Sequence, residues 1–344
     1  MRTAPFQRGR IIWVAFLMFL AWCPVLILAA EGTLRWKGVR PWRVFPLGIE
    51  VRPGGHFFTS DSLLGYTHLP GQFQVTLHGR YRFTVRHLPN TLRATHPPES
   101  PRENQKPELW IMGCSFTYGW SVNDEQSYPW LLQAEFPQYE VVNYGVNGYG
   151  TIHSLLQLRR DLAAGRIPRI VIIGYAGFHD QRNTFTRLRR KEVAPWTKLG
   201  SLRQPVARLG KDGNLGISYS DVNYHEFPFM RLSALSHYLE EKYNAYEDRR
   251  AQSHRVSEAI IREIANLSRI HHFALIVAGL DRFSWQNQAM LNFARVQGIR
   301  ALDVSVDLSA PENTNRPYDP HPSALAHRHF ADRLAGFLRA EGLE

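Results

Sequence analysis

From residue 107 onward, the sequence alternates short apolar runs with longer amphipathic stretches. Each apolar run ends near a glycine or a polar residue, which is typical of a strand buried on both faces. The amphipathic stretches repeat their apolar residues at helical spacing. Because strands that alternate with helices form parallel sheets covered on both faces, the pattern predicts a three-layer α/β/α domain with a flavodoxin-like parallel sheet. The predicted strands cover residues 108–113, 141–145, 168–174, 273–279 and 299–304, and the predicted helices cover residues 128–135, 152–164, 256–271 and 324–340.

Two regions depart from this pattern. Residues 36–106 are rich in proline and glycine and contain short alternating stretches, which predict a small β-rich region that ends in a polar, proline-rich linker. At about residues 181–250 the alternation breaks, and the chain becomes basic and then rich in aromatic residues. We interpret this stretch as an insertion within an α/β domain of residues 107–344. Its basic residues form either a solvated surface or, because long insertions are often functional, a lid over a substrate.

Residues 1–35 have the features of a membrane-targeting segment. Residues 11–30 contain no charged side chain and are long enough, as a helix, to cross the hydrocarbon core of a bilayer. A cleaved signal peptide and an uncleaved signal anchor are the two interpretations. The apolar run is longer than a signal peptide needs, and Leu28 stands where cleavage favours a small residue, so we expect an uncleaved transmembrane anchor. Cys23 is not expected to carry a lipid, because the preceding Trp22 is bulky where a lipidation signal needs a small residue.

Charge and cysteine content limit the partners of the chain. Its 344 residues include 41 Lys and Arg against 30 Asp and Glu, which gives a net charge of +11. This excess permits binding to anionic lipid, polysaccharide or nucleic acid and selects none of them. No motif of a known nucleic-acid-binding module accompanies it, so we expect no nucleic-acid partner. Cys23 and Cys114 are too few for a disulfide framework or a cysteine-based zinc site, and we expect neither a metal nor a cofactor.

The first segment with chemical potential follows the predicted strand at 108–113. There the chain runs directly into Gly113-x-Ser115-x-Thr117-x-Gly119. Ser115 would lie at the carboxyl end of a parallel strand, where functional residues of such sheets collect, with its backbone N–H at a turn or helix start. This position suits a nucleophile and an oxyanion donor. The spacing differs from the Gly-x-Ser-x-Gly elbow of α/β-hydrolases, and no Gly-Lys-Ser/Thr follows that would make a phosphate-binding loop.

The second such segment, Tyr-Asp-Pro-His-Pro, precedes the last predicted helix. Its Asp319 and His321 stand two residues apart in a loop, so the carboxylate can hydrogen-bond one imidazole nitrogen while the other nitrogen faces a site. Alone, such a pair is more often a turn with a surface histidine. Combined with Ser115 at a strand end, it gives the components of a Ser-His-Asp triad.

In order and content these segments resemble the SGNH/GDSL hydrolase superfamily. That family has a nucleophilic Ser in its first block, a Gly in its second, an Asn in its third and an Asp–His pair in its last. Ser115 matches the first block, Gly148 the second, within Asn-Tyr-Gly-Val-Asn-Gly-Tyr-Gly, and Asp319 with His321 the last. The resemblance covers about residues 108–338 apart from the insertion. It implies that Ser115, His321 and Asp319 form a catalytic triad, and that the backbone N–H groups of Ser115 and Gly148 belong to an oxyanion hole.

The third block departs from the family pattern. His179 followed by Asp180 stands where the family usually has Asn-Asp. Since a neutral imidazole donates one N–H hydrogen bond, His179 is the candidate for the third oxyanion donor, and Asn183 is a weaker substitute. The alternative is that His179 only packs in the core or pairs with Asp180.

The resemblance implies a serine esterase that acts on O-acyl, especially O-acetyl, esters of carbohydrate in a bacterial cell envelope. The expected location is the cytoplasmic (inner) membrane, crossed once, with the α/β domain on the extracytoplasmic, periplasmic side. An acyltransferase or a lipid esterase of the same fold is one alternative, and a non-catalytic glycan-binding or assembly component is another. The expected partners are an acylated carbohydrate or lipid substrate and the membrane.

Overall fold

A computed structural model describes residues 5–43, 48–97, 106–195 and 203–344. The chain divides into two compact units. One unit contains Met1–Pro46 together with Tyr224–Glu247, and the other contains Leu47–Asn223 together with Asp248–Glu344. The second unit holds the strands of the β-rich region and the α/β domain apart from Tyr224–Glu247. The domain boundaries at residues 35 and 106 stay predictions.

A five-stranded parallel sheet forms the centre of the larger unit, with the strand order β12-β11-β8-β6-β7. All five strands expected from the sequence are present, which confirms the predicted α/β fold class. The strands are β6 (Glu108–Met112), β7 (Glu140–Asn143), β8 (Ile170–Tyr175), β11 (Ala274–Asp281) and β12 (Arg300–Val306). Every residue of β8, the central strand, is buried, as its unbroken apolar sequence predicts.

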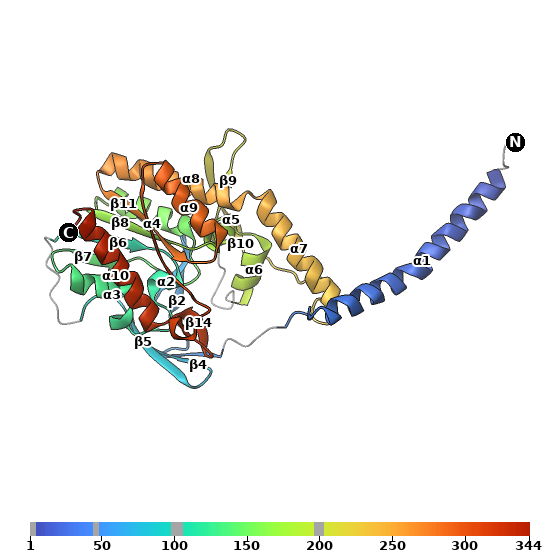
Figure 1. The fold of residues 1–344 in the computed structure, drawn as a ribbon, viewed down its shortest axis with the longest axis horizontal. Coiled ribbons are helices and arrows are strands. Elements are labelled where there is room, and N and C mark those ends of the chain that lie inside the picture. The colour runs from blue at the N-terminus through green and yellow to red at the C-terminus, as the bar shows by residue number, and fades with distance from the viewer. Residues whose placement is uncertain (1–4, 44–47, 98–105, 196–202) are drawn as a thin grey trace. The chain divides into compact units, whose positions relative to one another are not determined.

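Helices cover both faces of this sheet (Figure 1). On one face, α3 (Tyr128–Glu135) and α10 (Ala324–Ala340) pack against each other and bury apolar side chains such as Leu132 and Phe330. On the other face lie α4 (Thr151–Ala163), α8 (Ser253–His271) and α9 (Trp285–Val296). Helix α9 was not predicted from the sequence. Its Ser284 caps the first turn by accepting a hydrogen bond from the backbone N–H of Asn287.

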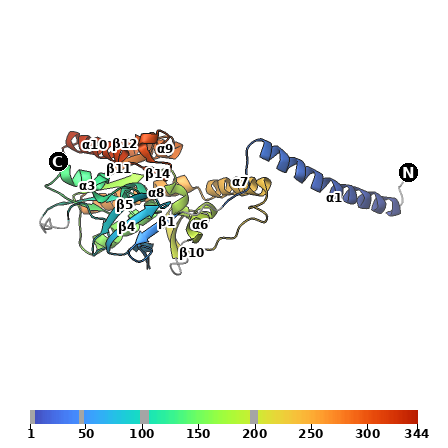
Figure 2. The same cartoon turned by 90° about the horizontal axis from the view of Figure 1, so that it is seen from below.

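The β-rich region packs on the strand-end segment that follows Ser115. Figure 2 shows β1 (Ile49–Arg52), β4 (Gly71–Leu77) and β5 (Tyr81–His87) side by side, and they form an antiparallel sheet. A separate hairpin pairs β2 (Phe58–Asp61) with β3 (Gly65–His68). The apolar residues of this region share one core cluster with Tyr118 and Trp120. The β-rich region is therefore part of the surroundings of the predicted nucleophile.

The insertion contains regular structure. It includes α5 (His179–Thr184), α6 (Arg187–Val193), a hairpin of β9 (Arg203–Leu209) and β10 (Leu215–Asp221), and α7 (Ala234–Arg250). Val206 and Ala207 of this hairpin are buried in the main core beside Leu64 and Tyr66. This part of the insertion therefore packs into the protein and is not only a solvated basic surface.

The smaller unit joins the N-terminal helix α1 (Pro5–Trp36) to the segment before and within α7. The carboxylate of Glu31 accepts hydrogen bonds from the Ser233 hydroxyl (2.8 Å) and from the backbone N–H groups of Ala234 (2.9 Å) and Leu235 (2.8 Å). These bonds satisfy donors at the start of α7 that have no partner within the helix. Arg35 adds a bond to the Leu232 carbonyl oxygen at 2.7 Å.

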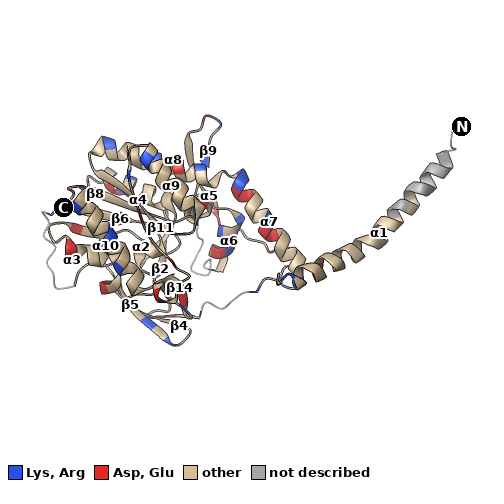
Figure 3. Ribbon diagram, in the orientation of Figure 1, with Lys and Arg blue, Asp and Glu red and all other residues tan. Residues whose placement is uncertain are grey.

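Helix α1 contains the whole stretch of residues 11–30 that was expected to target the membrane. Its part Leu17–Trp36 has a mean hydropathy of 1.8 and an exposed apolar surface. No charged residue lies between residues 17 and 30 of α1, and Figure 3 draws most of the described part of this helix in tan, the colour of uncharged residues. The helix is thus long and apolar enough for a membrane span, a property that signal sequences near an N-terminus share.

The two interpretations of α1 predict different fates of the chain. If α1 is an uncleaved anchor, membranes washed with alkaline carbonate should retain the full-length protein, because a transmembrane helix is held by the hydrocarbon core. The measurement is an immunoblot against a C-terminal tag in the pellet and in the supernatant. A shortened protein in the supernatant would identify a cleaved signal peptide.

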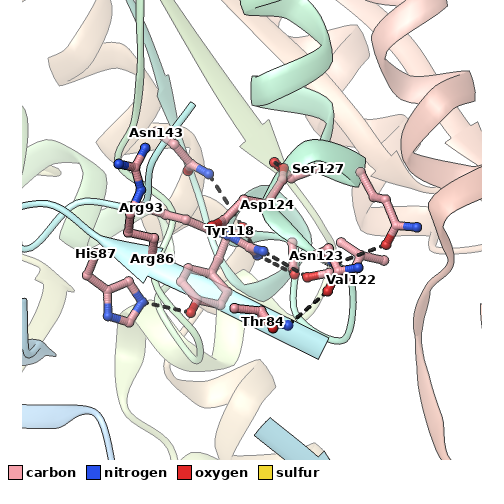
Figure 4. A network of polar contacts seen from close by, with 12 residues as sticks. Thr84, Arg86, His87, Arg93, Tyr118, Val122, Asn123, Asp124, Ser127 and Asn143 are labelled. Atoms are coloured by element: carbon pink, nitrogen blue, oxygen red, sulfur yellow. Dashed lines mark hydrogen bonds and ion pairs between the residues drawn. The ribbon is translucent and has the colours of Figure 1, made fainter. Parts of the chain in front are cut away.

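A buried arginine ties the β-rich region to the loop after Ser115 (Figure 4). The side chain of Arg93 is fully buried and ion-pairs through Nε with Asp124 Oδ1 at 2.8 Å. Its guanidinium donates hydrogen bonds to the carbonyl oxygens of Tyr118 (2.7 Å), Val122 (2.8 Å) and Gly119. It also lies over the Tyr118 ring, 4.7 Å from the ring centroid. One side chain therefore fixes three backbone carbonyls of the turn that leads away from the predicted nucleophile.

Neighbouring contacts extend this network (Figure 4). The Tyr118 hydroxyl pairs with His87 Nε2 at 2.8 Å, and the backbone N–H of Thr84 donates to Asn123 Oδ1 at 2.8 Å. Asn143, at the end of β7, donates to the carbonyl oxygen of Tyr118 at 3.4 Å. Strands β5 and β7 thus both hold the loop.

Replacing this arginine should destabilise the protein. Arg93→Met keeps much of the side-chain volume but removes the ion-pair partner of Asp124 and one buried donor from each of three carbonyl oxygens. We expect a loss of about 3–5 kcal/mol of folding free energy, since removing one partner of a buried ion pair leaves an uncompensated charge. The melting temperature should fall by roughly 6 °C or more.

The matched control is Arg159→Met, because Arg159 is exposed and pairs only at the surface, with Glu263 at 2.8 Å. Loss of that pair should cost less than about 1 kcal/mol. Thermal unfolding of the full-length protein in detergent measures both variants. Equal melting temperatures for the two variants would contradict the structural role of Arg93.

Candidate active site

Ser115 lies where the sequence predicts it, just after the end of β6. It is the first residue of the short helix α2 (Ser115–Tyr118), and its backbone N–H is one of the helix-start donors that lack a partner within the helix. Gly113 allows the close turn between strand and helix. A Cβ at that position would lie 2.3 Å from Thr117 Oγ1 and 3.0 Å from the Gly174 carbonyl oxygen. The strand-to-helix turn therefore requires glycine at this position.

The second segment brings Asp319 and His321 to Ser115. Both belong to β14 (Asp319–Pro322), which pairs with β13 (Thr314–Asn315) just before α10. His321 Nε2 lies 3.0 Å from Ser115 Oγ, and His321 Nδ1 lies 2.7 Å from Asp319 Oδ1. The three side chains form a continuous chain of hydrogen bonds although Ser115 and His321 are far apart in the sequence.

Asp319 is held by donors from two elements. Its carboxylate accepts bonds from the His321 backbone N–H (2.8 Å), from Trp120 Nε1 (3.0 Å) and from the Ser121 hydroxyl (3.2 Å). Ser121 is in turn held by Asn315, whose amide nitrogen lies 2.8 Å from the Ser121 hydroxyl oxygen. Burial raises the pKa of the Asp319 carboxyl, but the hydrogen bonds from His321 and Trp120 outweigh it and bring the pKa below its usual value. The carboxylate thus stays ionised beside the imidazole.

The triad side chains border a cavity of about 350 Å³. Its lining is largely apolar with a few polar and charged groups, as is typical of small-molecule sites. The β-rich region supplies Ile49, Phe58, Thr59 and Tyr66, the insertion supplies Arg182, Arg189 and Val193, and the α/β domain supplies Ser115, Trp120, Asn147, Gly148, Asp319, Pro320 and His321.

Gly148 lines the same cavity as Ser115. Its φ is +80°, in the left-handed region, and a Cβ would lie 2.5 Å from the Tyr66 hydroxyl and 2.6 Å from Arg189 Nη2. Glycine is therefore required by both conformation and space. Arg189 fixes the peptide through a 2.6 Å hydrogen bond to the Gly148 carbonyl oxygen. Ser115 and Gly148, the two predicted backbone donors, thus border one cavity with His321.

His179 and Asn183 do not line the cavity. His179 is fully buried between Tyr175 and Phe178, and among the described residues neither of its ring nitrogens has a hydrogen-bond partner. Burial and the charge of Arg182 lower the pKa of His179 well below its usual value, so the ring is neutral. The donor role that the sequence suggests for His179 has no support from these contacts and stays a prediction.

Asn183 has a structural role. Its amide nitrogen donates to the hydroxyls of Thr151 (2.6 Å) and Ser257 (2.9 Å), and its oxygen accepts from the backbone N–H of Ile152 at 2.9 Å. These bonds join α4, α5 and α8. They occupy the amide groups that an oxyanion donor would need.

Several residues around the site were not found by sequence reasoning. Trp120 and Ser121 hold Asp319, Tyr66 borders the cavity from the β-rich region, and Arg182 and Arg189 border it from the insertion. The only sequence signal for the arginines was the basic character of the insertion, which equally fits a solvated surface. Within the described part of the chain, no group of three or more His, Cys, Asp or Glu side chains could hold a metal ion.

Comparison with known proteins finds similarity at the level of structure. No model of a known protein family and no curated protein matches the sequence. A solved lipolytic protein of the G-D-S-L family from Desulfitobacterium hafniense has 16% identity and a TM-score of 0.38, with 67% of this chain and 99% of that chain covered. A carbohydrate acetylesterase family member from Sinorhizobium meliloti has 12% identity and a TM-score of 0.38, with 68% and 98% covered. An acetylxylan esterase from Geobacillus stearothermophilus, solved as a catalytic mutant, has 16% identity and a TM-score of 0.37, with 68% and 93% covered.

Proposed function

We propose that the protein is a serine esterase of the SGNH/GDSL type, with Ser115 as nucleophile, His321 as general base and Asp319 as the group that orients the base. The observation that carries this proposal is the hydrogen-bonded chain from Asp319 through His321 to Ser115 Oγ at the edge of a cavity. A nucleophile, a base within reach and an orienting carboxylate are the parts that acyl transfer requires.

Acylation begins when Ser115 Oγ attacks the carbonyl carbon of a bound ester. His321 Nε2 takes the hydroxyl proton, and Asp319, bonded to Nδ1, fixes the tautomer that leaves Nε2 free to accept it. The tetrahedral intermediate then collapses. The alcohol leaves with the proton from His321, and the acyl group stays on Ser115.

The negative charge on the intermediate needs donors beside Ser115. The backbone N–H groups of Ser115 and Gly148 are the proposed oxyanion donors, because both residues border the cavity and Gly148 is fixed by Arg189. In the second half-reaction, water gives a proton to His321 and attacks the acyl group, which releases the acid and restores Ser115. A sugar hydroxyl in place of water would make the protein an acyltransferase.

The proposed substrates are O-acyl, chiefly O-acetyl, esters of envelope carbohydrate. The cavity volume of about 350 Å³ is near the low end of ligand sites, roughly 300–1,000 Å³, which favours a short acyl group over a lipid chain. Helix α1, which is long and apolar enough to span a membrane, supports a site held near a membrane and its surface glycans. The extracytoplasmic side is part of the proposal and rests on the family resemblance and on the N-terminal position of the helix.

Removing the nucleophile tests the proposal directly. The Ser115→Ala variant of the full-length protein in detergent should lose roughly 10³-fold or more of its turnover of p-nitrophenyl acetate, because the acyl-enzyme cannot form. Ser309→Ala is the matched control, since Ser309 is exposed and lies outside the cavity lining. Equal rates for Ser115→Ala and the unmodified protein would contradict the catalytic proposal and favour a non-catalytic glycan-binding role.

The length of the acyl chain tests the proposed substrate class. Because the cavity is small, kcat/KM for p-nitrophenyl acetate should exceed that for p-nitrophenyl octanoate by roughly tenfold or more. The two rates are compared at equal detergent concentration, with Ser115→Ala as the blank for each. A preference for octanoate would favour the lipid-esterase alternative.

A further inference from the structure

Two arginines face the cavity that Ser115 borders. Arg182 comes from α5 and Arg189 from α6. The other charged or titratable groups of the lining are Asp319 and His321, which are bonded to each other, and Tyr66, whose hydroxyl accepts a bond from Arg189. The mechanism proposed above uses neither guanidinium directly. Their presence in a largely apolar cavity therefore needs another explanation.

Arg189 is fixed in place. It is 7% exposed, and its Nη2 donates to the Gly148 carbonyl oxygen at 2.6 Å and to the Tyr66 hydroxyl at 3.2 Å. Its Nη1 pairs with Glu192 at 3.1 Å, but the Glu192 side chain is 48% exposed. A half-exposed carboxylate compensates a buried charge only weakly, since water screens it.

Arg182 is less fully paired. Its Nη1 donates to the Tyr149 carbonyl oxygen at 3.1 Å, and its guanidinium lies over the Phe178 ring, 4.2 Å from the centroid. Within the described residues no carboxylate forms an ion pair with it. A guanidinium has five N–H donors, so most of the hydrogen-bonding capacity of Arg182 is not used by these contacts.

Two cations that share a cavity repel each other, so each raises the free-energy cost of burying the other. Arg182 is partly buried, and this burial together with the nearby charge of Arg189 lowers the pKa of Arg182, although an arginine remains protonated. Desolvated charges are tolerated when an opposite charge is supplied. A planar guanidinium matches a carboxylate or a similar oxyanion with two parallel hydrogen bonds, and the neighbouring Arg189 adds a second positive charge.

We infer that this cavity selects ester substrates that carry an acidic group close to the acylated hydroxyl, with Arg182 as the binding residue for that group and Arg189 as its electrostatic support. The substrate class is an O-acetylated acidic carbohydrate, in which the ester and the acid lie on the same or on adjacent sugar units, because both must fit one cavity of about 350 Å³. The inference rests on the proposed esterase function, which accounts for the ester group of the substrate. It adds an acidic group as a second requirement for the substrate.

The test uses two esters that differ only in charge. The full-length protein is given an O-acetylated methyl glucuronoside and its C6 amide, and acetate release is measured. Selectivity is kcat/KM for the acid divided by kcat/KM for the amide. We expect a selectivity of roughly tenfold or more, falling toward one in Arg182→Gln. Arg182→Lys should be intermediate, because it keeps the charge and loses the planar fork.

Arg159→Gln is the matched control, since Arg159 lies outside the cavity lining, and its selectivity should equal that of the unmodified protein. Equal kcat/KM for acid and amide in the unmodified protein would overturn the inference, and this comparison needs no variant to fold. Retained selectivity in folded Arg182→Gln would also overturn it.

A binding arm separates this inference from the esterase proposal. Calorimetry measures the affinity of Ser115→Ala, and of Ser115→Ala with Arg182→Gln, for the same acid and amide. If no ester is turned over in a Ser115-dependent way, the esterase proposal fails. A preference for the acid that depends on Arg182 would still support the anion site, and binding without such a preference would overturn it.

Discussion

The buried guanidinium of Arg93 holds together the parts on which the site depends. Its bonds to three carbonyl oxygens fix the turn that follows α2, and this turn carries Trp120 and Ser121. Those two side chains hold Asp319 from the opposite end of the domain. The position of Asp319 is thus set not only by its own loop but also by the β-rich region, through the buried side chain of Arg93. A buried charge with a full set of acceptors is rigid, because each lost contact leaves an unpaired polar group.

The cavity depends on two regions that a minimal α/β domain would lack. A parallel sheet places Ser115 at the ends of its strands, but strand ends alone leave a nucleophile open to water. Here β2 and β3, which precede the parallel sheet in the sequence, contribute Phe58 and Tyr66 to the cavity lining. Helices α5 and α6 of the insertion contribute two arginines. The partly enclosed, largely apolar space strengthens the electrostatic contacts within it. Part of the excess positive charge of the insertion therefore lies beside the proposed nucleophile.

The local sequence pattern was sufficient to predict the strands of the sheet and to locate Ser115, Asp319 and His321. The five apolar runs correspond to the five strands, of which the central strand β8 is apolar and buried along its whole length. Ser115 and the Asp-x-His spacing could be located because each depends on only a few neighbouring residues. The buried residues of helix α9 follow helical spacing, but the polar Asn287 is among them and the apolar Trp285 and Val296 at the helix ends are exposed, which obscured the pattern.

The sequence by itself determined a parallel α/β domain, an apolar N-terminal helix, and a serine and an Asp–His pair at chemically suitable points. Only the tertiary structure decided that these groups lie within hydrogen-bond distance of one another. It also decided that Arg182 and not His179 borders the cavity, although the two lie three residues apart in α5. Residues at this spacing share one face of a helix, so the helical pattern does not separate them, and the packing of α5 against the rest of the protein sets which one reaches the cavity. Contacts between residues far apart in the chain, such as Arg93 with Asp124 and Tyr66 with Arg189, depend on that packing and leave no local pattern in the sequence.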